Sequence, residues 1–285
     1  MALSKPPTTR VIAVANQKGG VGKTTTVVNL ATALARLKQT VLVIDADPQA
    51  NATSGLGVAP REGFSLYPAL VNAHELDDFI VGTTVENVNL IPAELGLAGA
   101  EVEIARMEDH LHVFNRILQP IVKSGVFNWI LIDCPPSLGI LMSNSLATAD
   151  SVMVPMQCEY YAMEGLSVIL GLIERLRLGG INPRLRLEGI LMTLFDGRTR
   201  LSEDVVAQVR EHYGEAVYQT VIPRNVRTSE APSYGMPVIM YDPSSRGTEA
   251  YLAFGKEFLK RALTRLQAES LLADGDAAPN PAKPV

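Results

Sequence analysis

A glycine-rich segment near the start of the chain contains residue types that could bind a chain of phosphates. It reads Gln17-Lys18-Gly19-Gly20-Val21-Gly22-Lys23-Thr24-Thr25. Because glycines have no side chains, the backbone N–H groups are free to curve around an anion at the start of a helix. The Lys23 ammonium would then reach the β- and γ-phosphates of a nucleotide, and the Thr24 hydroxyl would coordinate Mg²⁺. The segment therefore predicts a nucleotide-binding phosphate loop.

This segment departs from the usual phosphate-loop motif at one position. The motif G-x-x-x-x-G-K-[ST] would place its first glycine at position 17, where this chain has glutamine. A glycine-rich turn followed by a chance Gly-Lys-Thr is the alternative interpretation. The flanking residues argue against it, because an apolar strand pattern at 11–15 precedes the segment and an amphipathic helical pattern follows it. Strand, loop and helix in that order are the context that a phosphate loop requires.

Three aspartates follow two other apolar runs. Asp45 and Asp47 come after the run at 40–44, and Asp133 comes after the run at 129–132. Ligands of open α/β sheets bind outside the carboxyl ends of the strands, so we expect all three aspartates to face the phosphate loop. Asp133 fits the carboxylate that holds nucleotide-bound Mg²⁺. Simple turn formation with the prolines that follow is the alternative for any one of them, but it is a weak explanation for three together.

The elements that must position these residues alternate between strand-like and helix-like patterns, which is typical of a parallel sheet with helices on both faces. We expect strands at 11–15, 40–44, 88–91, 129–132, 151–156, 187–194, 217–222 and 238–241. We expect helices after the phosphate loop, at 65–71, largely through 94–122, after 156, from Ser202 as the capping residue to 213, and at 246–266, with a loop at 50–63.

The fold predicted from this alternation is α/β: a single-domain P-loop NTPase with a mostly parallel, twisted sheet and helices on both faces. We expect the domain to cover 10–268. Residues 1–9 are predicted to be a flexible N-terminus. The Ala/Pro/Asp-rich segment 269–285 has little to bury and is predicted to be a disordered tail.

Composition excludes several other classes of protein. The chain has 285 residues with 25 basic and 30 acidic side chains, a net charge of −5, so any nucleic-acid binding must come from a local patch. Its two cysteines, Cys134 and Cys158, lack the spacing of a disulfide framework, a zinc site or an iron–sulfur cluster, and we expect both to be packed. His110 and His112 would face different ways on a helix and are expected at the surface. The N-terminus lacks the apolar core of a signal peptide, which predicts a cytoplasmic protein.

Five segments together resemble the ParA/Soj chromosome- and plasmid-partitioning ATPases. Residues 18–24, 45–49 and 133–137 resemble the deviant Walker A, switch I and switch II/Walker B segments of that family. The likeness continues through 194–199 and 222–227, so it covers nearly all of the chain up to about residue 265. The glutamine at position 17 agrees with this family.

The resemblance implies an ATP- and Mg²⁺-dependent homodimer in which two subunits face each other across two nucleotides. Lys18 of each subunit would reach the phosphates bound by the other, whereas a solvated loop cation is the alternative for Lys18. Asp47 would orient or deprotonate the attacking water, Asp45 would lie near the metal, and Asp133 would hold Mg²⁺ through its water shell. A cation delivered across an interface is worth roughly 10³ to 10⁵ in the rate of phosphoryl transfer.

The resemblance also implies binding to DNA without sequence preference. Arg198 and Arg227 match positions where ParA-like proteins contact DNA. Several other arginines of the C-terminal half are expected to be solvated or salt-bridged surface residues. The ATP-bound dimer would bind DNA and be released when a ParB-like, centromere-binding partner stimulates ATP hydrolysis. A cytoplasmic, nucleoid-associated protein with no membrane partner is expected. Its cargo, whether chromosome, plasmid or another body, stays open.

Proteins of the same fold also have other functions. A MinD-like membrane ATPase should end in a basic amphipathic helix, but residues 266–274 are acidic. An iron–sulfur carrier would place cysteines to hold a cluster. An amidating ligase stays open if residues 51–64 recognise a small substrate. A nucleotide-binding scaffold without turnover is the non-enzymatic alternative.

Overall fold

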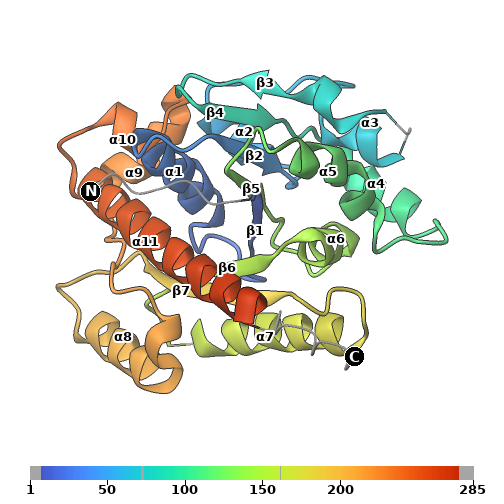
Figure 1. The fold of residues 1–285 in the computed structure, drawn as a ribbon. Helices are drawn as coiled ribbons and strands as arrows, with labels where there is room; N and C mark the ends of the chain where they lie inside the picture. Colours follow the sequence, from blue (N-terminus) through green and yellow to red (C-terminus); the bar gives the residue numbers. More distant parts are fainter. Residues whose placement is uncertain (1–7, 72–73, 161, 276–285) are drawn as a thin grey trace, which may run out of the picture.

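The computed structural model describes residues 8–71, 74–160 and 162–275, and within them a seven-stranded sheet forms the centre of the molecule (Figure 1). The strands lie in the order β3-β4-β2-β5-β1-β6-β7. All neighbours pair in parallel except β3, which is antiparallel to β4 at the edge. The bounds are β1 Arg10–Val14, β2 Val41–Asp45, β3 Val81–Gly82, β4 Val88–Ile91, β5 Trp129–Asp133, β6 Ser151–Gln157 and β7 Arg186–Thr193.

Helices cover both faces of this sheet. The α-helices are α1 Lys23–Arg36, α2 Asn51–Gly55, α3 Leu66–Val71, α4 Leu97–Ile104, α5 Val113–Ser124, α6 Ile140–Thr148, α7 Ala162–Leu178, α8 Arg200–Tyr213, α9 Val226–Glu230, α10 Val238–Tyr241 and α11 Arg246–Gly275. The described residues also form the 3₁₀ helices η1 Leu76–Phe79, η2 Gly214–Ala216 and η3 Ala231–Tyr234. The predicted α/β class, with a mostly parallel sheet between helical layers, is confirmed.

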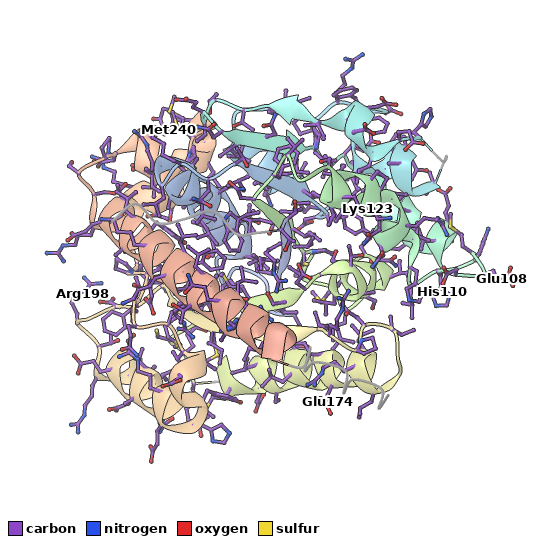
Figure 2. All side chains as sticks on the ribbon, in the orientation of Figure 1. Glu108, His110, Lys123, Glu174, Arg198 and Met240 are labelled. Carbon is purple, nitrogen blue, oxygen red and sulfur yellow. The ribbon has the colours of Figure 1, made fainter. Side chains whose placement is uncertain are left out.

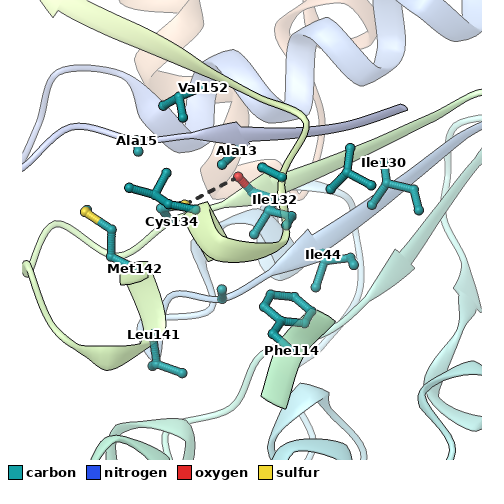
Figure 3. Close-up of a cluster of buried hydrophobic side chains, with 14 of the residues drawn as sticks. Ala13, Ala15, Ile44, Phe114, Ile130, Ile132, Cys134, Leu141, Met142 and Val152 are labelled. Atoms are coloured by element: carbon teal, nitrogen blue, oxygen red, sulfur yellow. Dashed lines mark hydrogen bonds between the residues drawn. The ribbon is translucent and has the colours of Figure 1, made fainter. Parts of the chain in front are cut away.

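The strands are apolar along their whole length because both of their faces are buried. In β1, Val11 and Ala13 belong to the core layer that α3 to α8 cover, whereas Ile12 and Val14 belong to the layer beneath α1, α10 and α11. Figure 3 shows part of the first layer, with Cys134 packed in the middle of it. Burial raises the pKa of this thiol to about 12, so Cys134 is a packing residue, as the sequence predicts.

Helices α1 and α11 pack closely on the second face (Figure 1). A Cβ placed on Gly255 of α11 would lie 2.6 Å from the Cβ of Ala33 in α1, so the glycine permits this approach. Further along α11, Arg265 pairs with the buried Glu188 of β7 at 3.0 Å. Helix α11 therefore contacts both α1, which follows the phosphate loop, and the edge strand β7.

Several predicted elements were wrong. The segment predicted as a strand at 238–241 is helix α10, because a short apolar run does not distinguish a buried strand from a buried helix. Among the residues described, the segment at 217–222 is not a strand: Val217 forms an isolated bridge with Ile190, and the Ile222 N–H donates to the Met192 carbonyl. The predicted loop at 50–63 contains helix α2.

The ends of helices also differ from the predictions. Helix α8 is capped by Thr199, whose Oγ1 accepts a hydrogen bond from the Ser202 N–H, so the expected capping residue is itself inside the first turn. Helix α11 continues to Gly275, beyond the predicted start of a tail at 269. Thr9 is buried and donates a hydrogen bond to the Phe127 carbonyl at 2.7 Å, so the chain is already fixed at this position. Residues 1–7 and 276–285 of the two predicted flexible ends lie outside the described residues.

In the described part of the chain, no helix is both long and apolar enough to cross a bilayer.

Candidate functional site

The glycine-rich loop lies between the end of β1 and the start of α1, as predicted. Gly20 and Gly22 have φ angles of 74° and 84°, in the left-handed region that glycine adopts without strain. Gly22 is the N-cap of α1 and has no side chain to satisfy the first N–H groups of the helix. These N–H groups and the positive end of the helix dipole form a site suited to an anion.

Two side chains from distant strands hold the carbonyls of this loop. Gln157 at the end of β6 donates to the Gly20 carbonyl at 2.7 Å, and Thr193 at the end of β7 donates to the Val21 carbonyl at 2.8 Å. In a trans peptide the C=O and the following N–H point in opposite directions. Because these carbonyls point toward β6 and β7, the N–H groups of Val21 and Gly22 point away from these two strands.

Lys23 follows the loop and is buried, with 7% of its surface exposed. Its Nζ donates to the Lys18 carbonyl at 3.1 Å. Burial lowers the pKa of Lys23, and the carboxylates of Asp133 and Asp47 oppose this shift. In the described part of the chain this buried ammonium has one hydrogen bond and nearby carboxylates, so phosphate oxygens would provide it with further hydrogen bonds and compensating charge.

A cavity of about 520 Å³ opens beside the loop. Its size suits a nucleotide. Lys23, Thr24 and Asp47 line it together with the loop glycines, and Arg224 and Asn225 line it as well. The residues of the predicted nucleotide site that line this cavity are Gly19, Gly20, Gly22, Lys23, Thr24, Thr25 and Asp47. Val21 is buried and Lys18 is partly exposed, and neither of them lines the cavity.

Asp45 and Asp133 are neighbours at the carboxyl ends of β2 and β5, where the parallel register pairs them directly. Both are fully buried. Asp45 accepts hydrogen bonds from the N–H of Asp47 at 3.2 Å and from the N–H and hydroxyl of Thr53 at 2.8 and 2.7 Å. Burial raises the pKa of Asp45 to about 6, and the hydrogen bonds from Thr53 oppose this shift. The side chain of Asp45 thus braces the segment that follows β2.

Asp133 has a different environment. Neither of its carboxylate oxygens has a hydrogen-bond partner of normal geometry among the residues that the structure describes. Burial and the nearby Asp45 carboxylate raise the pKa of Asp133 well above its usual range, and Thr24 and Lys23 counter this only in part. An unpartnered buried carboxylate next to a hydroxyl suits a bound cation or a water held by one. Of the three predicted magnesium residues, Thr24 and Asp133 fit that chemistry best.

Lys18 does not enter the cavity. Its Nζ lies 2.6 Å from Oε2 of Glu159, which follows β6, and about 40% of the Lys18 side chain is exposed. Its backbone N–H is bound by the side chain of Asn16 at 3.0 Å. Lys18 is therefore an ion-paired residue at the rim of the site in the single chain, not a freely solvated one.

The two arginines predicted to contact DNA also have carboxylate partners. Arg198, on the loop before α8, stands at the outer edge of the molecule (Figure 2) and makes two hydrogen bonds to Asp196, at 2.9 and 2.7 Å. Its side chain is 86% exposed. Arg227, in α9, pairs with Glu230 at 2.9 Å and with Asp242 at 3.4 Å. The hydrogen bonds from Arg198 lower the pKa of Asp196, so this carboxylate is ionised at neutral pH.

Comparison with known proteins extends the likeness to almost the whole chain. A family model described as an AAA domain matches residues 9–187. The chain is 49% identical over 249 residues to the Bacillus subtilis sporulation initiation inhibitor protein Soj, covering 87% of this chain and 97% of that protein. It is 46% identical over 257 residues to the Caulobacter vibrioides chromosome partitioning protein ParA, covering 90% and 96%. The chain belongs to the ParA/Soj family of chromosome-partitioning ATPases.

Solved structures agree with this assignment of the fold. A structure of cobyrinic acid a,c-diamide synthase from Mycobacterium smegmatis, with a bound ATP analogue and magnesium, matches with a TM-score of 0.75 and 38% identity, and covers 87% of this chain and 93% of that one. The ParA/Soj relatives are more similar in sequence than this synthase and extend beyond the AAA match into α11. The family resemblance predicted from the sequence is confirmed.

Four side chains of this ParA/Soj site were not predicted from the sequence: Thr53, Gln157, Glu159 and Thr193. Gln157 and Thr193 end strands at the same edge of the sheet as the predicted aspartates. The rule that ligands bind at this edge could have suggested them. Thr53 and Glu159 carry no such signal, because their partners Asp45 and Lys18 are known only from the folded chain.

Proposed function

We propose that this chain is a DNA-partitioning ATPase whose ATP-bound homodimer binds DNA without sequence preference. A ParB-like partner would stimulate hydrolysis and release the dimer from DNA, and the protein would work in the cytoplasm at the nucleoid. One observation carries the ATPase part of this proposal: the buried Lys23 ammonium, the Thr24 hydroxyl and the open N-terminus of α1 line one cavity, and the buried Asp133 carboxylate lies next to Thr24 and Lys23. The partitioning part is supported by the similarity to ParA and Soj.

In this proposal ATP lies in the cavity with its phosphates on the glycine-rich loop. Lys23 would bind the β- and γ-phosphates, and Thr24 and Asp133 would hold Mg²⁺. When bound, the magnesium ion neutralises charge on the phosphate oxygens. Asp47 lines the same cavity, and its Oδ1 accepts a hydrogen bond from the Gln49 N–H at 3.0 Å. The other carboxylate oxygen would orient or deprotonate the attacking water.

Lys18 is proposed to act across the dimer. It would leave Glu159 and reach the phosphates bound by the second subunit, where a cation stabilises the charge that spreads over the γ-phosphoryl oxygens. Hydrolysis would then require dimerisation. The ion pair with Glu159 is about half exposed, so its loss is a small cost against the gain from a triphosphate.

Lys18→Ala should therefore bind ATP with an affinity close to that of the original chain and yet lose turnover. We expect kcat to fall by roughly 10³-fold, the lower end for a cation supplied across an interface. Steady-state hydrolysis and equilibrium binding of ATP measure the two effects separately. Lys256→Ala, which removes an exposed lysine of α11, is the matched control and should behave as the original chain does. Normal partner-stimulated turnover by the Lys18 variant would exclude the cross-dimer role.

DNA binding is proposed to depend on Arg198 and Arg227. A dimer that brings both copies of each arginine to one face presents four cations, whereas a monomer presents two. Each neutralised phosphate adds about 0.9 to the slope of log affinity against log salt concentration, so doubling the contacts converts weak binding into useful binding. Both arginine side chains are more than half exposed, at 86% and 54%, so DNA phosphates can compete with their carboxylate partners.

Arg198→Glu and Arg227→Glu should each lose ATP-dependent DNA binding and keep ATP binding and dimerisation. The loss should be equal for unrelated DNA sequences, because phosphates carry no sequence information. Filter binding across a salt series and gel filtration with ATP measure the two properties. Arg177→Glu is the matched control, since Arg177 is also an exposed arginine paired with a glutamate, here on α7. An unchanged salt slope in a variant that still dimerises would refute the role of that arginine.

A second candidate function is an amidating ligase on the same fold, because the Mycobacterium smegmatis structure bears the name of a diamide synthase. Its identity of 38% is below the 46% and 49% of the ParA and Soj proteins, which favours partitioning. Retention on DNA in the presence of ATP, ADP or no nucleotide separates the two functions. Retention that requires ATP supports partitioning, and equal passage of all three samples contradicts it.

A further inference from the structure

The segment that joins β2 to α2 folds back on the side chain of Asp45, the last residue of β2. Asp45 binds the N–H of Asp47 with Oδ1 and both the N–H and the hydroxyl of Thr53 with Oδ2. The 45–53 segment is therefore a loop that returns to the carboxylate from which it began. Asp47, the proposed water-orienting residue, lies inside this loop and faces the cavity.

The same loop contains a strained residue. Ala50 has φ 53° and ψ 35°, the left-handed conformation, in which a Cβ crowds the backbone. Ala50 is buried, and its N–H donates to the Asp47 carbonyl at 2.9 Å. A residue without a side-chain hydrogen bond keeps this conformation only where its surroundings enforce it. The bonds from Asp45 to the residues before and after Ala50 provide that enforcement.

The Thr53 hydroxyl bonds both to the start of this loop and to a neighbouring strand end. It is fully buried, donates to Asp45 at 2.7 Å and accepts from the Ala93 N–H, just after β4, at 3.0 Å. The hydroxyl thus connects the carboxyl ends of β2 and β4. The Thr53 N–H would still bind Asp45 without the hydroxyl, but the connection to Ala93 would be lost.

We propose that Thr53 is a positioning residue for ATP hydrolysis, which acts through Asp45 on the strained loop that presents Asp47. This inference rests on the proposed role of Asp47. Removing the hydroxyl takes away one of the three hydrogen bonds that Asp45 accepts, and the loop loses part of what holds Ala50 in the left-handed region. Asp47 would then sample orientations away from the cavity. The phosphate cradle would not change, because Gln157 and Thr193 hold it independently.

The test compares Thr53→Val with Thr53→Ser. Valine has the shape of threonine without its hydroxyl, and serine keeps the hydroxyl without the methyl group. We expect kcat to fall roughly tenfold in Thr53→Val, since a hydrogen bond to a charged group is a strong one, with the dissociation constant of ATP within about twofold of its original value. Thr53→Ser should recover most of kcat. This split between turnover and binding, with rescue by serine, is not expected from a residue that only fills space.

Two controls make the result specific. Thr32→Val removes another fully buried threonine hydroxyl, in the middle of α1, where it bonds the Val28 carbonyl. It should lower the melting temperature and leave kcat unchanged. Asp47→Ala reports on the proposed function itself. If Asp47→Ala turns over ATP normally, the role of Asp47 fails, and the role of Thr53 fails with it.

The inference alone is overturned if Asp47→Ala loses turnover while Thr53→Val keeps kcat within about twofold. It is also overturned if Thr53→Ser is as slow as Thr53→Val, because the methyl group would then be the part that matters. Should Thr53→Val not fold, Thr53→Ala removes the same hydroxyl with less bulk and is judged by the same comparison with serine.

Discussion

Lys23→Ala will abolish tight binding of ATP. Lys23 is the buried ammonium in the wall of the cavity. Burial lowers its pKa, and the negative charges nearby offset this effect only in part. A triphosphate would supply that charge, so the lysine contributes more here than an exposed cation would. We expect the dissociation constant to rise at least roughly 100-fold, about 2.8 kcal/mol at 1.4 kcal/mol for each factor of ten.

Titration calorimetry with ATP and Mg²⁺ measures this change. Lys18→Ala is the informative comparison, because Lys18 lies at the rim of the same loop and should bind ATP almost normally on its own subunit. The nucleotide-free Lys23 variant should be at least as stable as the original chain, since it no longer buries an ammonium. Unchanged affinity in Lys23→Ala would mean that nucleotide binds elsewhere.

Asp47→Ala should keep ATP binding and the ATP-dependent dimer but lose turnover by roughly 10² to 10⁴-fold, the range for a general base. The substitution removes the carboxylate that faces the cavity and leaves the loop glycines and Lys23 in place. Its backbone N–H can still bind Asp45, so the strained turn should survive. Single-turnover hydrolysis and gel filtration test this expectation. A variant that stays monomeric with ATP contradicts this division of roles.

Much of the site could be predicted because it follows from local sequence patterns. Three glycines before Lys23 mark a loop that needs left-handed backbone, and Gly20 and Gly22 adopt it. An aspartate at the end of a continuous apolar run must lie at the carboxyl edge of a parallel sheet. The direct pairing of Asp45 with Asp133 is the result of that rule applied to two adjacent strands.

Two of the contacts that were missed join residues that are distant in sequence. Gln157 and Gly20 are 137 residues apart, and Lys18 and Glu159 are 141 residues apart, so no local pattern links them. Local rules also failed where they were ambiguous: Val238–Tyr241 is apolar enough for a strand, but it folds as a helix after Pro237. The exposure of Arg198 was predictable, whereas its bonds to Asp196 required the structure.

The side-by-side placement of Asp45 and Asp133 also bears on how long the folded chain survives in a cell. Because the pKa of Asp45 is raised to about 6, its carboxyl group favours the folded state in acid, and that contribution is lost as the pH rises through 6. Burial of these two acidic side chains therefore lowers the free energy of unfolding of the nucleotide-free protein at neutral pH. A ligand that binds only the folded chain restores stability by RT ln(1 + [L]/Kd), about 2.7 kcal/mol at one hundred times Kd. The supply of nucleotide would then set the abundance of the protein as well as its activity, because chains without ligand would unfold and be degraded first.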